Sequence, residues 1–488
     1  MTEPLWTSTE WTFPKIERVY DAIQEIAVEE MGLEPYPAQL EIITSEQMVD
    51  AYTSIGLPIF YHHWSFGKHF THQWTQYQRG LTGLAYEIVI NSDPSIAYLM
   101  EENTMTMMAL TISHACMGHS HFFRNNYLFR QWTDAASIVD YLLFARAYIK
   151  KCEVREGSAE VETFLDSCHS LMNYGVNRYK RPAKLSPAKE RKRDDERDAY
   201  RQSKNSELAE FFKSLQAEEG SVSEKKFPQE PEENILFFCE KYAPDLPEWK
   251  REIIRIVRKI SQYFYPQGLT KLMNEGAASY CHYRIMHRLH DKGLMTDGSM
   301  LEFLQSHTNV VFQPAFDDRR YSGLNPYAIG LGMMCDIERI CNEPTAEDRK
   351  QFRDFAGCQD PMMVLREAWQ NYRDESFVRQ FLSNKLIRDM DLFELKDVRR
   401  ESEYLVTAIH DDNGYDMIRE TLANSYERQQ MIPEIEVVRV DPKTRELFLE
   451  YKPYQKRALA NADKMIKHIH ALWGYPVSIH DTKQNRIT

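Results

Sequence analysis

Apolar residues recur with helical spacing over much of the chain. Three stretches carry them three or four positions apart, which predicts amphipathic helices at residues 16–31, 249–265 and 269–290. Gly293 lies just beyond the last of these, where a glycine commonly ends a helix. Residues 96–123 are the most apolar part of the chain, with apolar side chains on nearly all sides of a helical wheel. This pattern predicts a buried helix that begins near Pro94.

The pattern changes near residue 385, where short strand-like runs begin to alternate with helices. The expected order is a strand at 404–410, a helix at 414–429, a hairpin of 435–440 and 446–451, a helix at 461–473 and a strand at 475–480. This β-α-β-β-α-β order is that of a ferredoxin-like unit, and a further strand is expected near 392–395. Two earlier runs, 40–44 and 306–314, also look extended.

These patterns divide the chain into four expected units. The units are a helical N-terminal part at 1–181, a charged linker or insertion with four prolines at 182–233, a second helical part at 234–384 and an α+β domain at 385–488. The predicted fold class is therefore α+β. A predominantly helical N-terminal and central core is followed by a C-terminal ferredoxin-like domain.

Composition and charge narrow the function classes. Of the 488 residues, 43% are hydrophobic and 27% are charged, so we expect a large folded core. The formal net charge of −13 argues against nonspecific binding to nucleic acid or to an anionic membrane. We find no apolar run long enough to span a membrane and no secretory signal, so we expect no integral membrane association. Eight scattered cysteines are typical of reduced thiols in a cytoplasmic protein.

Histidines gather in the most apolar stretch, where an unpaired polar group is costly. His114, His119 and His121 lie within eight residues of one another. His114 and His119 are five positions apart, so they share a face only where the helix is locally widened, for example by a π-bulge near Gly118. Three histidines this close favour a metal site. Core histidines that hydrogen-bond to their neighbours are the alternative.

A second predicted helix carries a complementary pair. Glu275 and His282 are seven positions apart and share a helix face. We therefore predict one zinc or iron ion, with the candidate ligands His114, His119, Glu275 and His282 and with His121 as an alternate. An ordinary polar contact between helices is the alternative.

Three other segments are expected to line a pocket beside this site. Their candidate residues are His63, Trp64, Lys68, Glu87, His307 and Asn309. Residues 321–327 are candidates for supporting or substrate-facing groups. A packed aromatic turn around His63 and a plain structural turn around His307 are the alternatives.

Several enzyme classes lack support in this sequence. It contains no P-loop and no GxGxxG motif, so we expect no nucleotide cofactor, and it contains no GxSxG motif. The zinc-protease motif HExxH is also absent. Residues 114–119 resemble a degenerate form of it, but Ala115 takes the place of the catalytic glutamate and the histidines are one position too far apart. Amide hydrolysis here would need another residue to activate water.

Six segments carry distinctive motifs, at residues 63–68, 86–92, 100–104, 114–123, 274–276 and 306–311. In these segments, and over nearly the whole chain, the sequence resembles the SpoVR family (stage V sporulation protein R), in particular its longer YcgB-type members from non-sporulating Gram-negative bacteria. One departure is visible. Relatives in this family carry tryptophan after the Asn-Glu-Gly of 274–276, where this chain has the smaller Ala277.

The resemblance implies a cytoplasmic bacterial protein linked to the spore cortex or, in non-sporulating species, to stationary-phase and stress physiology. It also implies a PrkA-like serine kinase and a von Willebrand factor A-domain protein as partners. Two hypotheses follow. The first is a zincin-like, metal-dependent enzyme that hydrolyses an amide bond in an envelope-related substrate. The second is a non-enzymatic adaptor that works with the kinase and the A-domain protein.

Overall fold

The computed structural model describes residues 3–54, 59–78, 87–179, 227–397, 404–427, 432–453, 461–481 and 486–487, and the single positions 192, 196, 199 and 459. Most of the predicted linker 182–233 lies outside these residues. The fold is mixed α+β, as the sequence predicts, with many helices and small sheets. Among the helices described, none combines the length and the apolar character needed to cross a membrane.

The N-terminal part surrounds a small sheet with helices. β1 (Ala38–Ile43) pairs in parallel with β3 (Ser95–Met100), and β3 pairs antiparallel with β2 (Glu87–Ile90). The accompanying helices are α1 (Phe13–Glu25), its π-helical continuation η1 (Ile26–Glu30), α2 (Ser45–Thr53) and α3 (Trp64–Gln78). The predicted helix at 16–31 and strand at 40–44 are confirmed.

The predicted single helix at 96–123 is wrong at its start. Residues Ser95–Met100 form the central strand β3, and the helix begins only at Met105, where Thr104 accepts a hydrogen bond from the backbone N–H of Met107. The helical path then runs through α4 (Met105–Thr111), the π-helix η2 (Ile112–His119), α5 (Ser120–Asn125) and α6 (Tyr127–Trp132). A short, largely buried apolar run has no clear periodicity that separates strand from helix, which explains the error.

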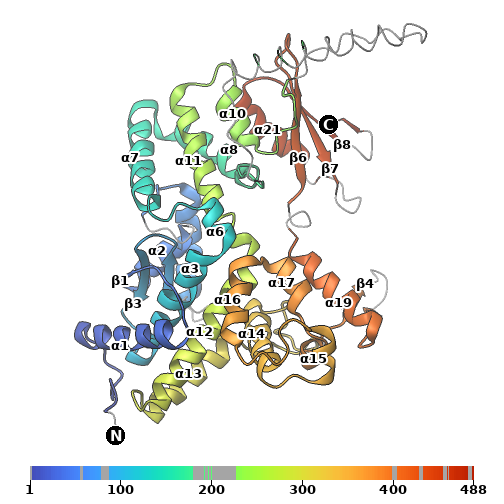
Figure 1. Cartoon of the computed structure of the whole chain (residues 1–488). Coiled ribbons are helices and arrows are strands. Elements are labelled where there is room, and N and C mark those ends of the chain that lie inside the picture. Colours follow the sequence, from blue (N-terminus) through green and yellow to red (C-terminus); the bar gives the residue numbers. More distant parts are fainter. Residues whose placement is uncertain are drawn as a thin grey trace.

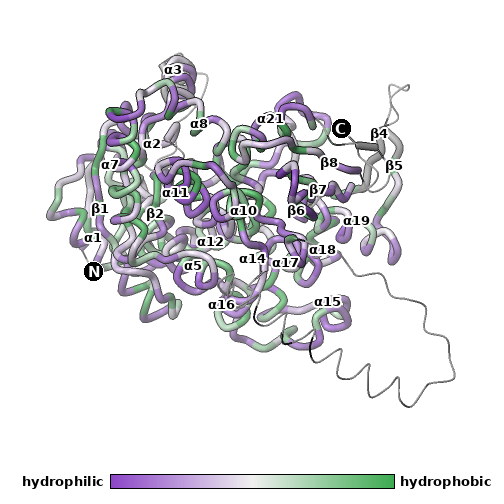
Figure 2. The backbone as a smooth tube through the Cα atoms, turned by 90° about the horizontal axis from the view of Figure 1, so that it is seen from above, coloured by the Kyte–Doolittle hydropathy of each residue, from purple (hydrophilic) through white to green (hydrophobic). Residues whose placement is uncertain are grey.

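α12 (Lys271–Asp291) lies in the middle of the molecule, with other elements around it (Figure 2). It packs against η2 and against α14 (Pro326–Asn342), and glycines make both contacts close. A Cβ on Gly118 would lie 2.5 Å from the Cα of Ala278, and a Cβ on Gly276 would lie 2.6 Å from the carbonyl carbon of Gly330. The helices that carry the candidate ligands therefore meet at backbone distance.

Shorter helices complete this region. They are η4 (Gln267–Leu269), α13 (Asp297–Val310), α15 (Ala346–Gln351), α16 (Pro361–Asn371), α17 (Asp374–Phe381) and α18 (Asn384–Asp389). The predicted extended run at 306–314 is wrong in its first half, because 306–310 is the last turn of α13. The helical packing of His307 against α12 outweighs the strand preference of its β-branched neighbours.

The described apolar side chains form two cores. The first core surrounds α12 and includes residues of α1, η2, α14, α16 and α17. The second core lies in the upper part of Figure 1, among α7 (Ile138–Glu156), α8 (Ser158–Ser170), η3 (Met172–Tyr174), α10 (Ile235–Tyr242) and α11 (Glu248–Phe264). Each core draws residues from several of the four units expected from the sequence.

The C-terminal strands belong to two separate sheets. β6 (Glu434–Val440), β7 (Leu447–Lys452), β8 (Val477–Asp481) and β9 (Arg486–Ile487) form one sheet in that order, and α21 (Ala462–Trp473) packs on it in the second core. β4 (Glu394–Asp397) and β5 (Tyr404–Ala408) form a two-stranded sheet, and α19 (Asp412–Ser425) packs on α17 in the first core.

This arrangement corrects the predicted ferredoxin-like domain. A ferredoxin-like unit would place the strand at 404–410 in one sheet with the three strands that follow. In the part of the chain that the structure describes, β5 instead pairs with β4. Ala408, Tyr415 and Ile418 are buried in the first core, which draws β5 and α19 away from β6. The order of elements and the hairpin of β6 and β7 are predicted correctly, but the partner of β5 is not.

Candidate metal centre

Three donor atoms from two helices converge inside the first core. His114 and His119 lie on η2 and Glu275 lies on α12, and their donor atoms all lie within 4.8 Å of one another. Glu275 Oε2 is 3.8 Å from His114 Nε2 and 3.5 Å from His119 Nε2. Two ligands of a tetrahedral zinc ion, each bonded at about 2.0–2.1 Å, lie about 3.3 Å apart. The three atoms are therefore spaced as slightly relaxed metal ligands.

The π-helix η2 brings the two histidines together. In a π-helix the residues i and i+5 lie one above the other, so His114 and His119 share a face. Their ring centroids are 4.6 Å apart. The local widening predicted near Gly118 is confirmed, and the missing side chain of Gly118 lets α12 bring Glu275 to the same point.

The other nitrogen of each ligand ring has a polar partner. His119 Nδ1 is 2.9 Å from Asn274 Oδ1, and an amide oxygen only accepts, so Nδ1 carries the proton and Nε2 has a free lone pair. His114 Nδ1 is 2.8 Å from His282 Nδ1, and His282 Nε2 is 2.7 Å from His307 Nδ1. Donation from His114 to His282 and on to His307 satisfies this chain and leaves a lone pair on His114 Nε2. Such outer contacts fix the tautomers of metal-binding histidines.

The electrostatics of the cluster call for a cation. Glu275 Oε2 is buried and makes no hydrogen bond of normal length within the described structure, although it faces both Nε2 atoms. Burial acts to lower the pKa of His114, but the carboxylates of Glu275 and Glu87 raise it overall. Burial and the charge of His114 lower the pKa of His119 to about 4, so this ring is neutral, as a metal ligand must be.

Two further polar side chains approach the cluster. Glu87 reaches it from β2, with Oε1 3.7 Å from His114 Nε2, and burial raises its pKa. Tyr327, in the first turn of α14, interacts with the Glu275 carboxylate. The pKa of Tyr327 is raised mainly by burial and to a smaller extent by the charges of Glu275 and Glu87. Glu87 was predicted as a pocket-lining residue, and Tyr327 falls in the 321–327 segment. The cluster thus contains two carboxylates from different elements.

Comparison with known proteins places the chain in a family. Residues 10–431 match the family described as SpoVR like protein, and residues 433–484 match the SpoVR-like C-terminal domain. The chain belongs to the SpoVR family. It is 50% identical over 486 residues to a protein of Escherichia coli (strain K12) described as uncharacterized protein YcgB, which covers 99% of this chain and 95% of that relative. No solved structure gives a significant match.

The two SpoVR matches meet where the packing also changes. The boundary at 431–433 lies between α19, which packs in the first core, and β6, which packs in the second. All the residues of the metal cluster lie in the longer SpoVR match. The cluster is therefore a feature of the main SpoVR segment and not of its C-terminal domain.

The structure gives three of the predicted histidines other positions. His282 is not among the converging donors and lies behind His114, and His307 lies behind His282. His121 faces away from the cluster, since its Nδ1 accepts a hydrogen bond from the backbone N–H of Glu34 at 2.8 Å and its ring contacts Trp369. His114 and His121 are seven positions apart, which would put them on one face of a regular α-helix, but the π-helical turn between them removes that alignment.

The remaining pocket candidates either contact α8 or are exposed to solvent. His63 and Trp64 both contact Asp166 of α8, at 3.2 Å and 2.9 Å. Lys68 is exposed on α3, and Asn309 is exposed at the end of α13. Ala277 is buried in the first core. Sequence reasoning missed the role of Asn274, for which the only signal was an amide directly beside Glu275.

Proposed function

We propose that this SpoVR-family chain binds one zinc or iron(II) ion through His114, His119 and Glu275 and uses it to hydrolyse an amide bond. The observation that supports this most strongly is the meeting of two Nε2 lone pairs with an unpaired, buried carboxylate oxygen. Two histidines and one glutamate are the ligands of several zinc hydrolases, which keep a fourth position for water. The core therefore resembles a zincin in its set of ligands, two histidines and one glutamate, although it lacks the HExxH motif.

The surrounding residues have roles consistent with hydrolysis. A bound ion would supply Lewis-acid activation of water and of the scissile carbonyl. Glu87 is a carboxylate beside the ligands that is not one of the three converging donors, and it accepts the proton of the attacking water. It replaces the base that is missing at Ala115. Asn274 and His282 hold the two histidine rings, and Tyr327 holds Glu275.

Metal content and amide hydrolysis together test this proposal. Elemental analysis of protein purified without a histidine tag should give about one ion per chain for wild type and Glu87→Gln and none for His119→Ala. His121→Ala is the matched control, because His121 lies on the same helical path but faces away, and it should keep the ion. Peptide and muropeptide amides are the substrates, and Glu87→Gln should lower the rate by about 100-fold or more while the ion stays bound.

The two parts of the proposal fail in different ways. A well-folded wild type that holds no metal after reconstitution would rule out the metal site. A protein that binds the ion but cleaves none of these amides would contradict only the hydrolase assignment. Two histidines and one carboxylate also suit iron(II) with open positions, so the identity of the metal decides which chemistry to assay next.

The cellular setting is proposed from the family resemblance. We expect the substrate to be a precursor of an envelope polymer, or a regulatory protein, in the cytoplasm of a cell that is sporulating or under stationary-phase stress. A cytoplasmic enzyme would meet such precursors before they are exported.

The adaptor function is a separate proposal with its own supporting observation. α7 exposes Leu143 and Val154, which are 49% and 80% exposed and lie three turns apart on one face of the helix. Pull-downs with the PrkA-like kinase and the A-domain protein test it. If the protein is an adaptor that needs no metal, the His114→Ala variant should bind both partners as well as the wild-type protein does.

A further inference from the structure

A pair of cysteines lies in contact at a corner of the first core that the metal cluster does not use. Cys341 is in the last turn of α14 and is fully buried, whereas Cys358 is exposed in the loop between α15 and α16. Both are free thiols, and Cys358 lies close enough to Cys341 to contribute to the raised pKa of the Cys341 thiol. The Sγ of Cys358 also donates to the carbonyl of Asp360 at 3.7 Å. Cys335 is a free cysteine exposed on α14, and it has no cysteine partner among the contacts described.

Backbone hydrogen bonds on both sides of Cys358 hold its loop against the end of α14. The N–H of Gly357 donates to the carbonyl of Ile340 at 2.9 Å, and the N–H of Gln359 donates to the carbonyl of Cys341 at 3.1 Å. The side-chain amide of Gln359 also donates to the carbonyl of Asn342 at 2.9 Å. Gly357 and Gln359 have positive φ angles of 81° and 61°, which turn the loop back onto the helix.

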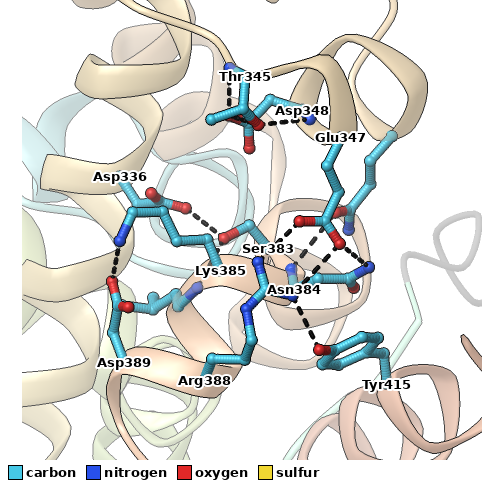
Figure 3. Close-up of polar contacts among 12 residues, drawn as sticks. Asp336, Thr345, Glu347, Asp348, Ser383, Asn384, Lys385, Arg388, Asp389 and Tyr415 are labelled. Carbon is cyan, nitrogen blue, oxygen red and sulfur yellow. Dashed lines mark hydrogen bonds and ion pairs between the residues drawn. The ribbon is translucent and has the colours of Figure 1, made fainter. Parts of the chain in front are cut away.

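Polar contacts hold the end of α14 in place. Arg339 bonds to Asp336 at 2.8 Å and to Asp348 at 2.7 Å. Asp336 in turn accepts from Ser383 at 2.5 Å, and Asp348 accepts from Thr345 at 2.7 Å (Figure 3). The helix and the segment that leads to the loop are therefore anchored to the same network. The two thiols stay in reach of each other because neither element can move away easily.

We propose that Cys341 and Cys358 form a reversible intramolecular disulfide, with a low-molecular-weight disulfide such as glutathione disulfide as the oxidant. The exposed Cys358 thiolate attacks one sulfur of glutathione disulfide, which forms a mixed disulfide and releases one glutathione. The Cys341 thiol then loses its proton, attacks the Cys358 sulfur and releases the second glutathione. Two protein thiols and one glutathione disulfide thus give one protein disulfide and two molecules of glutathione.

Burial assigns the order of the two steps. Burial, with smaller contributions from Cys358 and nearby acids, raises the pKa of Cys341 to about 12. A buried, protonated thiol is a poor first nucleophile, but it reacts with a sulfur that is already beside it. Cys358 is reached first because it is exposed.

The disulfide would act locally. Cys341 is eleven residues from Gly330, where α14 touches α12, which corresponds to about 16 Å of helix. The link ties α14 to the loop before α16 and does not touch the donors of the metal cluster. The inference is therefore independent of the proposed function.

Mass spectrometry of the full-length protein tests the proposal. The protein is incubated with glutathione disulfide, its remaining thiols are alkylated, and the digest is analysed before and after dithiothreitol. We expect a peptide pair joined through Cys341 and Cys358, with two hydrogens lost and restored on reduction. The oxidised protein should also melt a few degrees higher, because the disulfide restricts the conformations of the unfolded chain. Its metal content should not change.

Three variants separate the roles of the thiols. Cys358→Ser should abolish the link, and Cys341→Ser should leave glutathione stably attached to Cys358. Cys335→Ser is the matched control on the same helix and should form the link as wild type does. Wild type in which Cys358 keeps glutathione without forming the link would overturn the proposal. So would wild type in which both thiols stay alkylatable while Cys335 is modified.

Discussion

At the residue scale, the two histidine ligands differ in the groups that hold them. His114 is supported by two further imidazoles, His282 and His307. His119 depends on the single amide of Asn274. Because Asn274 precedes Glu275 on α12, one short segment supplies both a ligand and the support for a ligand on the facing helix. The position of His119 should therefore be sensitive to one neighbouring side chain.

Asn274→Ala should weaken metal binding without removing a ligand. Without the Asn274 oxygen, the His119 ring is free to rotate and its proton can move from Nδ1 to Nε2. A proton on Nε2 must leave before the metal ion can bind there. We expect the affinity for zinc to fall by about 10- to 100-fold. Competition with a chromogenic chelator measures it, and Asn309→Ala, an exposed asparagine on α13, is the control. Equal zinc affinity in wild type and Asn274→Ala would show that the amide does not position the ring.

Residue types alone predict much of this cluster. His114, His119 and Glu275 were chosen because histidines and a carboxylate in apolar helices are costly unless they bind something, and the structure brings them together. The sequence could not show that His282 lies behind His114, since two helices carrying ligand-type residues can face each other in several rotations. Glu87 was expected to line a pocket beside the site, but its four-residue strand has no periodic signal that could show how close it comes to the ligands.

At the element scale, the distance between η2 and α12 decides whether the cluster exists. Gly118 lies directly over Ala278, so any side chain there meets the backbone of α12. The π-helical turn and this close approach act together, because one aligns the histidines and the other brings the carboxylate to them.

Gly118→Ala should damage both packing and metal binding. The added Cβ would lie 2.5 Å from the Cα of Ala278, so a helix backbone has to shift. We expect the free energy of unfolding to fall by about 1–3 kcal/mol and bound metal to be lost. Urea denaturation and elemental analysis measure these changes.

A second glycine provides the control for this prediction. A Cβ on Gly268 would meet no atom within 4 Å, so Gly268→Ala should keep both the stability and the metal. Equal stability and metal content in Gly118→Ala and Gly268→Ala would contradict the close approach of η2 and α12.

Elements with clear periodicity were predicted well, and those set by tertiary packing were not. The helix predicted at 249–265 corresponds to α11, and the one at 269–290 to α12, since each has a continuous pattern of apolar residues. Residues 96–100 and 306–310 were assigned to the wrong type because short apolar or β-branched runs suit either structure. The pairing of β5 was missed because Ala408 at its end, together with residues of α19, is buried in the first core.

At the scale of the whole molecule, both cores bury histidines that remain neutral. Burial lowers the pKa of His121 and of His307 to about 4 in the first core. In the second core, burial and the charge of His63 lower the pKa of His169 to about 3, and its Nε2 lies 2.5 Å from the hydroxyl of Tyr61. In both cores, burial removes hydration that a charged imidazole would need, which favours the neutral ring.

These buried histidines should make the metal-free protein sensitive to mild acid. In the unfolded chain an imidazole takes up a proton below about pH 6.5, whereas the folded protein resists protonation until about pH 3–4. The unfolded state therefore binds more protons in this interval, and the free energy of unfolding falls as the pH falls from 6.5 towards 4. Three groups oppose this trend, because the pKa values of His114 and Glu87 are raised and that of the buried Asp374 is raised to about 7. The histidines with a lowered pKa outnumber them. Between pH 7.5 and 5.5, each depressed histidine should cost about 1 kcal/mol.

The contribution of His169 can be isolated because it is far along the chain from the metal ligands and packs in the second core. His169→Asn removes the group that resists protonation, so the loss of stability between pH 7.5 and 5.5 should shrink by about 1 kcal/mol. Urea unfolding in the presence of a chelator measures the free energy of unfolding of both proteins at pH 7.5 and 5.5. The loss between these pH values is then compared between His169→Asn and wild type. His62→Asn replaces an exposed histidine of the neighbouring segment and should leave the pH dependence as it is in wild type. If His169→Asn loses as much stability on acidification as wild type does, the second core does not hold this imidazole neutral, and the acid sensitivity must come from other groups.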